Sequence, residues 1–420
     1  MKGVNMRYLT TNAKCYAKLC VFLLVFVFGL NIGLAKSYII SPLPLPTEKI
    51  LDINDQACNE ACLKKLYNNG LLFSFIAKFS PNITDKSLLE NFAQALARIN
   101  QIQESQKSSH FKIALIIPRQ TIGQYAVTIS NTILAYLMSK KIDFEFEVFD
   151  CIDEGITNLE STTYKITQSN FDFAIAILTQ QGTQNLIDNI NVSFPIYIPT
   201  INKERIQGDT PKNFYFGGIS YKKQLDILAS IAKDSQIVEY TDDSQIGTYL
   251  MDLLRAYDLH IIHQAIINNQ DASNFTKKLK TEEAFLDNTT LLLNTSASKS
   301  GLILSQIGYS KKQPKQFLST QINFNPTILQ LASPDNRKNF FVISAISPIS
   351  ADLVEYAALL NSDLKYDWVS YSTSVGVEFA LKDSHIKKSF LESMFNNQIE
   401  YKNHIYTTKG SNFVLVKTTN

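Results

Sequence analysis

Two short motifs place a serine three residues before a lysine, the spacing that serine acyl-enzymes use for a nucleophile and its base. They are Ser296-Ala-Ser-Lys299 and Ser384-His-Ile-Lys387. Neither has the companion Ser-Asp-Asn or Lys-Thr-Gly sequence that completes such a site. The Gly-x-Ser-x-Gly, Gly-x-Gly-x-x-Gly and Gly-x-x-x-x-Gly-Lys patterns of other enzymes and nucleotide-binding proteins are also missing. We therefore expect a protein that is not an enzyme.

Histidine is the commonest metal ligand, and two of the five histidines lie close together. His260 and His263 are three residues apart on a predicted strand, where odd spacing turns side chains to opposite faces. The others, His110, His385 and His404, are scattered. No metal site and no cofactor are expected.

Five cysteines are present, and three of them follow residue 35. Cys58 and Cys62 would lie on one face of a helix, close enough for a disulfide bond. An oxidising compartment favours this pairing. Two reduced cysteines, or pairing of either one with Cys151, are the alternatives.

Hydroxyl, amide and guanidinium groups follow the predicted strands, where they could bind a small polar or zwitterionic ligand. In a parallel sheet the loops after the strands meet at one edge. Arg119 could bind a carboxylate through two hydrogen bonds. The candidate ligand-binding residues are Arg119, Gln120, Thr121, Thr179, Gln180, Thr200, Asn202, Thr241, Asn294 and Thr295. Because such residues are common in loops, each could instead have a structural role.

From residue 110 onward the chain alternates strands with helices. The apolar run Lys112–Ile117 has the branched residues of a strand buried on both faces, and Pro118 ends it. Further strands are predicted at 144–149, 173–178, 195–198, 236–240, 260–267 and 290–293. Helices are predicted at 122–138, 156–168, 183–190, 221–233, 244–257, 273–283 and 297–307. The pattern predicts an α/β fold of two doubly wound parallel-sheet lobes with a binding crevice between them.

The predicted lobes divide the C-terminal part of the chain unevenly. Lobe 1 takes residues 110–215 and 340–380, lobe 2 takes residues 216–339, and strands are expected in residues 381–420. Ahead of them, residues 51–109 predict a small helical subdomain. Apolar residues recur there at the three- and four-residue spacing of a helix, at Leu88, Leu89, Phe92, Leu96 and Ile99.

The first 35 residues have the order of a signal peptide. Positive residues come first, then the apolar run Leu19–Leu30, then Gly33-Leu34-Ala35. Cleavage after Ala35 would lower the formal net charge from +2 to −2 and leave no basic face for nucleic acid. An uncleaved membrane anchor is the alternative. Residues 36–50 form a proline-rich spacer, and after it no run of about twenty apolar residues follows, so no membrane span is expected in the mature chain.

Several segments resemble type I periplasmic binding proteins, the bilobed solute-binding proteins of bacteria. The opening of that family is similar to residues 112–123, Val148-Phe149-Asp150 and residues 171–177. Asn213–Ile219 resembles the crossing into the second lobe, and Gly376–Phe379 resembles the final helix. More distantly, a helical part before a bilobed part resembles the outer-membrane activators of penicillin-binding proteins.

This resemblance implies a receptor in the periplasm that is not an enzyme. Its two lobes would close over a small polar ligand by a hinge motion. The alternative is an envelope scaffold or accessory protein, such as a cell-wall synthesis activator, that uses the same fold to dock a protein partner.

Overall fold

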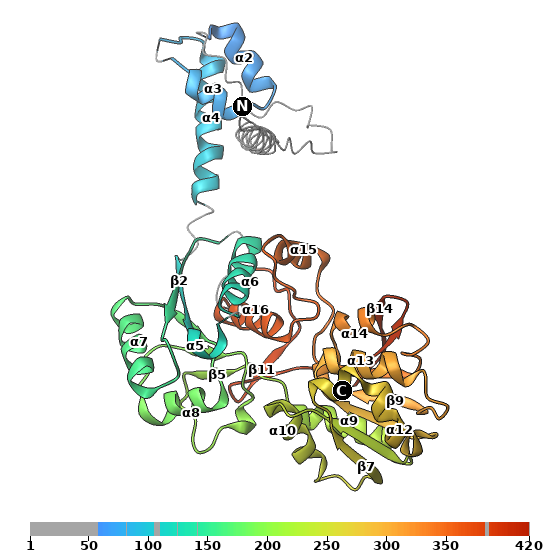
Figure 1. The fold of residues 1–420 in the computed structure, drawn as a ribbon. Helices are drawn as coiled ribbons and strands as arrows, with labels where there is room; N and C mark the ends of the chain where they lie inside the picture. The colour runs from blue at the N-terminus through green and yellow to red at the C-terminus, as the bar shows by residue number, and fades with distance from the viewer. Residues whose placement is uncertain are drawn as a thin grey trace, which may run out of the picture. The chain divides into compact units, whose positions relative to one another are not determined.

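The computed structural model describes residues 58–80, 82–104, 110–123, 125–140, 142–382 and 386–419. The predicted signal peptide (1–35) and proline-rich spacer (36–50) lie outside these residues. The chain divides into two units, Met1–Ile102 and Gln103–Asn420, and the described residues of each are compact (Figure 1). We call them the helical unit and the bilobed unit. Among the described residues, no helix has both the length and the apolar character that crossing a membrane requires.

The helical unit contains α2 (Glu60–Asn68), α3 (Leu72–Lys78) and α4 (Lys86–Glu104). Its core is apolar and includes the fully buried Leu63, Phe75 and Leu88. Asn59 caps α2, because its side chain accepts a hydrogen bond from the Cys62 N–H at 3.0 Å. The turn after α2 uses Gly70 with φ +73°, a backbone conformation that glycine adopts without strain.

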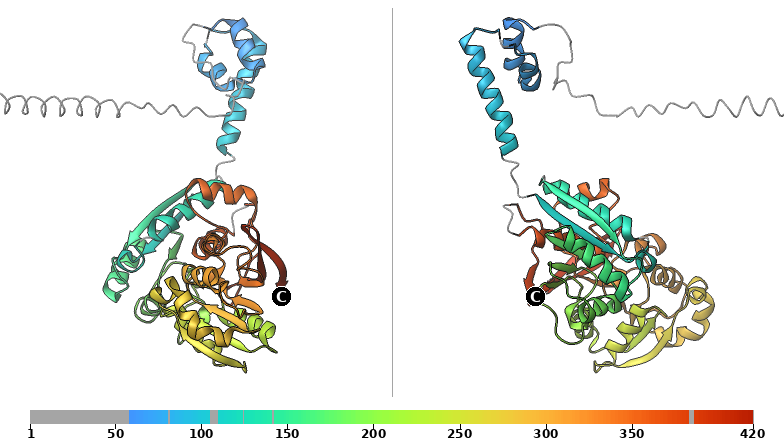
Figure 2. Two further views of the ribbon diagram at one scale, coloured as in Figure 1. Left: turned by 45° about the vertical axis from the view of Figure 1, so that its right-hand side comes forward. Right: turned by 90° about the vertical axis from the view of Figure 1, so that its left-hand side faces the viewer.

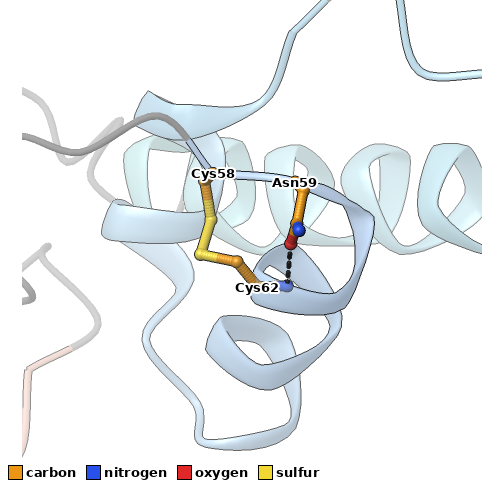
Figure 3. Close-up of a disulfide and its surroundings, with 3 residues drawn as sticks. All are labelled: Cys58, Asn59 and Cys62. Carbon is orange, nitrogen blue, oxygen red and sulfur yellow. Dashed lines mark hydrogen bonds between the residues drawn. A yellow bond between two sulfur atoms is a disulfide. The ribbon is translucent and has the colours of Figure 1, made fainter.

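Cys58 and Cys62 form the disulfide bond that the sequence favoured (Figure 3). Their Cα atoms are 5.3 Å apart, and the bond joins the residue before the Asn59 cap to the first turn of α2. The remaining described cysteine, Cys151, is buried as a free thiol in the bilobed unit.

Lobe 1 is a seven-stranded sheet in the order β11-β12-β5-β4-β3-β1-β2. Its strands are β1 (Phe111–Ile117), β2 (Phe144–Asp150), β3 (Phe173–Ala176), β4 (Ile196–Ile198), β5 (Phe214–Phe216), β11 (Ser393–Phe395) and β12 (Gln398–Glu400). The pairings from β2 to β12 are parallel, and β11 is antiparallel.

Helices cover both faces of the lobe 1 sheet, as the buried run in β1 requires. They are α5 (Arg119–Ile122), α6 (Tyr125–Lys140), α7 (Ile156–Gln168) and α8 (Gln180–Asn189). Ile113 and Leu115 belong to the same core cluster as Ile133 of α6. The alternate residue Ile116 belongs to a second cluster with Leu159 of α7. Successive side chains of β1 therefore supply two different cores.

Lobe 2 is a second seven-stranded sheet, in the order β14-β13-β10-β9-β8-β6-β7. Its strands are β6 (Ile237–Thr241), β7 (Ile261–Ile266), β8 (Thr290–Asn294), β9 (Gln316–Ser319), β10 (Phe340–Ser344), β13 (Asn403–Lys409) and β14 (Asn412–Thr419). Its helices are α9 (Tyr221–Ala232), α10 (Gln245–Leu254), α11 (Asn269–Ser273), α12 (Phe275–Leu286), α13 (Ala297–Ile307) and α14 (Pro326–Leu331). Two mostly parallel sheets with surrounding helices confirm the predicted fold class (Figure 2).

The return of the chain to lobe 1 is later than the sequence predicted. We expected residues 340–380 in lobe 1, but β10 pairs with β9 and β13 in the lobe 2 sheet. The crossing follows β10, after which α15 (Ala351–Leu359) and α16 (Trp368–Ala380) pack against α6 (Figure 1). The C-terminal strands are then shared, with β11 and β12 in lobe 1 and β13 and β14 in lobe 2.

Candidate functional site

A cavity of about 730 Å³ lies where β3 and β4 of lobe 1 end. The segments that follow these strands, α8 included, supply most of its wall. Helices α5, α6 and α16 add one residue each, and α10 of lobe 2 adds Gln245. The apolar residues of the wall are Ile122, Tyr125, Ile177, Leu178, Ile201 and Val369. The polar ones are Thr179, Gln180, Gln181, Gln184, Thr200, Arg205, Gln207 and Gln245. Polar residues outnumber apolar ones in this wall, which suits a ligand that carries polar groups.

Thr179 anchors the start of α8 at the edge of the cavity. Its hydroxyl oxygen accepts a hydrogen bond from the Gly182 N–H at 3.2 Å and caps the helix. Glu154 in turn accepts from the Thr179 N–H at 2.6 Å and from the Thr179 hydroxyl. A Cβ atom on Gly182 would lie 2.4 Å from the Glu154 carboxyl carbon, so a larger residue there would displace the Glu154 side chain.

Thr200 ties the two loops of the wall together. Its hydroxyl donates to the Leu178 carbonyl oxygen at 2.6 Å. Gln184 similarly holds the loop after the 3-10 turn Lys203–Arg205, because its Oε1 accepts from the Gln207 N–H at 3.0 Å. These bonds fix the shape of the wall before any ligand binds.

Arg205 is the cation of the cavity wall and also contacts lobe 2. Its Nη2 donates to Gln180 Oε1 at 2.7 Å, and Gln180 Nε2 donates back to the Arg205 carbonyl oxygen at 2.9 Å. The guanidinium lies 4.5 Å from the ring centroid of Tyr249 on α10. Burial raises the pKa of Tyr249, and the Arg205 cation opposes that shift. Among the described residues that line the cavity, none is acidic.

Known proteins match this chain by structure only. No family model and no curated protein matches the sequence. The branched-chain amino acid transporter substrate-binding protein LivJ from Streptococcus pneumoniae, solved with isoleucine, matches with a TM-score of 0.52 and 14% identity, over 73% of this chain and 99% of that one. An ABC transporter substrate-binding protein from Sphaerobacter thermophilus matches with a TM-score of 0.54 and 12% identity, over 74% and 98%. An R. palustris solute-binding protein in complex with benzoate matches with a TM-score of 0.52 and 11% identity, over 74% of this chain and 96% of that one.

The chain has the type I periplasmic binding protein fold. The resemblance drawn from the sequence is therefore confirmed at the level of the fold. In this fold the cavity described above lies at the carboxyl ends of lobe 1 strands and receives Gln245 from lobe 2. That position is the one at which doubly wound sheets place a ligand.

Of the ten candidate ligand-binding residues, the structure brings Thr179, Gln180 and Thr200 together on the cavity wall of this binding-protein fold. Arg119, Gln120 and Thr121 form α5 and are not part of the wall. The Arg119 side chain is 72% exposed, and its Nε lies 2.8 Å from Asp150 Oδ2.

The other four candidates are buried structural residues. Asn202 donates to the Gly218 carbonyl oxygen at 2.9 Å, at the first crossing between the lobes. Thr241 and Asn294 both donate to the buried carboxylate of Glu239. Thr295 shares a hydrogen bond of 2.6 Å with Ser300. The structure therefore does not place these residues on the cavity.

The sequence analysis missed Arg205 and Gln245. Arg205 stands only three residues after Asn202, so following that loop further would have found it. Gln245 opens α10, and nothing in its local sequence distinguishes it from other helix-start residues. The arrangement of the two lobes decides which lobe 2 helix has its first turn next to lobe 1. The local sequence does not show that arrangement.

Some of the motif and histidine residues singled out by the sequence have structural partners in the described part of the chain. Lys299 pairs with Asp243 at 2.9 Å, and the Ser296 N–H donates to Asp242 at 2.8 Å. The other Ser-x-x-Lys motif begins at a residue outside the described ones. His263 lies 2.7 Å from Glu282. In the described part of the chain, no three His, Cys, Asp or Glu side chains are grouped as a metal site would require.

Proposed function

We propose that the chain is a periplasmic receptor, not an enzyme, and that its bilobed unit captures a small polar ligand in the cavity beside β3 and β4. The observation that carries this proposal is the 730 Å³ cavity, whose wall combines apolar side chains with uncharged amides and one cation. The structures it resembles include solute-binding proteins solved with isoleucine and with benzoate. Both of those ligands carry a carboxylate.

The charge of the wall favours a carboxylate ligand without a positive group. Arg205 can donate to an anion, since only one of its guanidinium nitrogens bonds Gln180. An ammonium group would meet no acidic partner among the described lining residues. Glu154 lies next to the wall, but its two carboxylate oxygens already accept from Thr179. A monocarboxylate therefore suits the cavity better than a zwitterion.

Lobe 2 supplies the contacts that closure would use. Gln245 reaches the cavity from the first turn of α10, and Tyr249 one turn later stacks on Arg205. A ligand that binds Arg205 would thus adjoin the contact between the lobes, which is how a hinge motion becomes coupled to binding.

A melting-temperature screen tests the proposal. A ligand present at 100 times its dissociation constant should stabilise the protein by about 2.7 kcal/mol, a shift that is easily measured. The panel should contain monocarboxylates such as lactate and benzoate, amino acids such as leucine and glutamate, and uncharged sugars such as glucose. The expected result is a shift with a monocarboxylate. If no member of a broadened panel moves the midpoint, the receptor proposal is contradicted.

One observation favours a second function, that of an envelope scaffold. The helical unit has its own core and disulfide bond, which simple solute capture does not require. In the scaffold alternative this unit docks an envelope protein and the cavity stays without a ligand. Co-purification of an envelope protein that depends on residues 58–104, with no ligand shift from the screen, would favour it.

A further inference from the structure

A second cavity, of about 330 Å³, lies in the bilobed unit away from the one described above. It is bounded by the crossing segment after β10, by α15 and by the antiparallel strands β13 and β14. Its lining residues are Phe324, Ile346, Ser347, Pro348, Ile349, Val354, Lys365, Tyr366, Tyr406, Phe413 and Leu415. No lining residue is shared with the first cavity.

Aromatic rings form much of this second cavity. The ring of Phe324 lies 4.5 Å from that of Tyr406, 4.8 Å from that of Phe413 and 5.4 Å from that of Tyr366, measured between centroids. Phe324 and Tyr406 are buried, whereas Leu415 on the edge strand β14 is 44% exposed. The cavity therefore has a buried aromatic floor and an apolar rim that is open to solvent.

Two polar groups of the floor, the hydroxyls of Tyr406 and Ser347, are already bonded within the protein. The Tyr406 hydroxyl donates to the Ile346 carbonyl oxygen at 3.4 Å. The Ser347 hydroxyl donates to Glu392 at 2.9 Å and lies 3.3 Å from His404 Nε2. A ligand that reaches the floor would find hydrocarbon and ring faces, which an apolar body suits.

Lys365 is the charged residue of this lining. Its ammonium lies 4.9 Å from the ring centroid of Tyr366 and, within the part of the chain that the structure describes, forms no ion pair. The neighbouring Asp363 carboxylate is turned to the backbone, where it accepts from the N–H groups of Lys365 and Tyr366 at 2.8 and 3.0 Å. One exposed cation beside an apolar cavity is complementary to a molecule with one anionic end.

We propose that the second cavity binds a small amphiphilic acid, with its apolar chain against the aromatic floor and its carboxylate at Lys365. The argument does not depend on the proposed receptor function, because the two cavities have separate walls. A free fatty acid of medium chain length is the probe that represents this chemistry.

Calorimetric titration of saturated fatty acids from hexanoate to dodecanoate tests the proposal. The full chain carries Arg205→Gln, so that the first cavity binds a carboxylate at least about tenfold more weakly. Each added methylene should tighten binding about fourfold until the cavity is full, after which the gain stops. Octanoate should bind about two- to fivefold more tightly than octanol, the range of an exposed ion pair.

Two substitutions and a matched control separate the parts of the site. Lys365→Gln should remove the preference for octanoate over octanol and keep the chain-length dependence. Val354→Trp, at a half-buried position of the wall, should fill the cavity and abolish binding of both probes while the protein still melts cooperatively. The matched control is Lys382→Gln. Lys382 is another exposed lysine, and its ammonium lies 5.0 Å from the ring centroid of Phe379. This substitution should change neither the preference for octanoate nor the chain-length dependence.

Three results would overturn the proposal. One is an affinity that does not depend on chain length. Another is equal binding of octanoate and octanol in the protein with Lys365 intact. The third is undiminished binding in a folded Val354→Trp protein, which would place the fatty acid elsewhere.

Discussion

Glu239 is a buried carboxylate in the lobe 2 sheet. The need to bond it explains why the polar residues Thr241, Gln264 and Asn294 surround it. It lies on β6, between β7 and β8, and is 1% exposed. Its oxygens accept from Gln264 at 2.6 Å, from Asn294 at 2.8 Å and from Thr241 at 3.0 Å. A buried charge is tolerated only when such bonds replace its lost hydration.

Asn294→Ala should therefore lower the free energy of unfolding by about 2–3 kcal/mol, because it removes a hydrogen bond to a buried charged group. Urea unfolding measures this loss, and Asn269→Ala at an exposed helix start is the control with little expected effect. Binding in the first cavity should stay the same. A variant that loses ligand affinity without losing stability would contradict this structural role.

His404 gives the bilobed unit a pH dependence of known sign. Burial lowers the pKa of His404 below its usual value of about 6.5, so the folded protein holds it neutral. Between the folded and the unfolded pKa, the unfolded chain binds this proton and the folded chain largely does not. The stability that His404 contributes is thus fully present above pH 6.5 and is lost as the pH falls towards the folded pKa.

The His404→Gln protein should lose less stability than the wild type between pH 7 and pH 5. Urea unfolding at both pH values measures the difference, with the exposed His260→Gln as the matched control. Equal losses in the His404→Gln and wild-type proteins would contradict the inferred shift.

Helices and strands were the part of the fold that the sequence predicted best. The buried run at 112–117 became β1, and the helices predicted at 156–168 and 297–307 have those same bounds in the structure. Local hydrophobic pattern determines such elements. The assignment of 340–344 to a lobe failed because it depends on which of the two sheets β10 joins. The pairing of β10 with β9 and β13 leaves no signal in the local hydrophobic pattern of 340–344.

The disulfide bond in the helical unit should have a measurable effect on that unit alone. Replacing Cys58 and Cys62 by serine should destabilise it by about 2 kcal/mol, as the chain-entropy model gives for a loop this short. Hydrogen exchange on α2 and α3 would report the change. Equal protection in the two proteins, or lost protection in the bilobed unit, would contradict it.

Thiol counting checks the same bond chemically. Burial raises the pKa of Cys151 to about 12, so its thiol should resist alkylation in the native protein. The chain without residues 1–35 should show one thiol after denaturation and three after reduction. Three free thiols in the denatured protein before reduction would contradict the Cys58–Cys62 disulfide bond.

At the scale of the whole bilobed unit, the lobes are joined where the chain crosses between the two sheets. A Cβ atom on Gly217 would lie 1.9 Å from the Tyr197 hydroxyl oxygen, so the first crossing passes too close to lobe 1 for any other residue. The Tyr401 hydroxyl donates to the Gly217 carbonyl oxygen at 2.8 Å and holds the last crossing beside the first. If the proposed receptor closes over its ligand, these adjacent crossings are where its hinge motion would occur.

This arrangement of the lobes explains why the candidate site was only partly predictable. Thr179, Gln180 and Thr200 follow strands of one lobe, and parallel-sheet geometry was enough to find them. Arg119 follows β1 equally closely, but its side chain is exposed, pairs with Asp150 and lies outside the wall. The cation of the wall is instead Arg205, which the loop beyond Asn202 could have revealed, whereas Gln245 comes from the other lobe and could not be found this way.

The dissociation constant of the carboxylate that best stabilises the wild-type protein, measured by calorimetry for two arginine variants, tests the central claim most directly. Arg205→Gln should weaken binding by about tenfold or more, the value of one hydrogen bond to a charged group. Arg119→Gln, the matched control at an exposed arginine outside the wall, should bind as the wild type does. Unchanged binding by Arg205→Gln, or a loss in Arg119→Gln instead, would contradict a carboxylate site in the cavity beside β3 and β4.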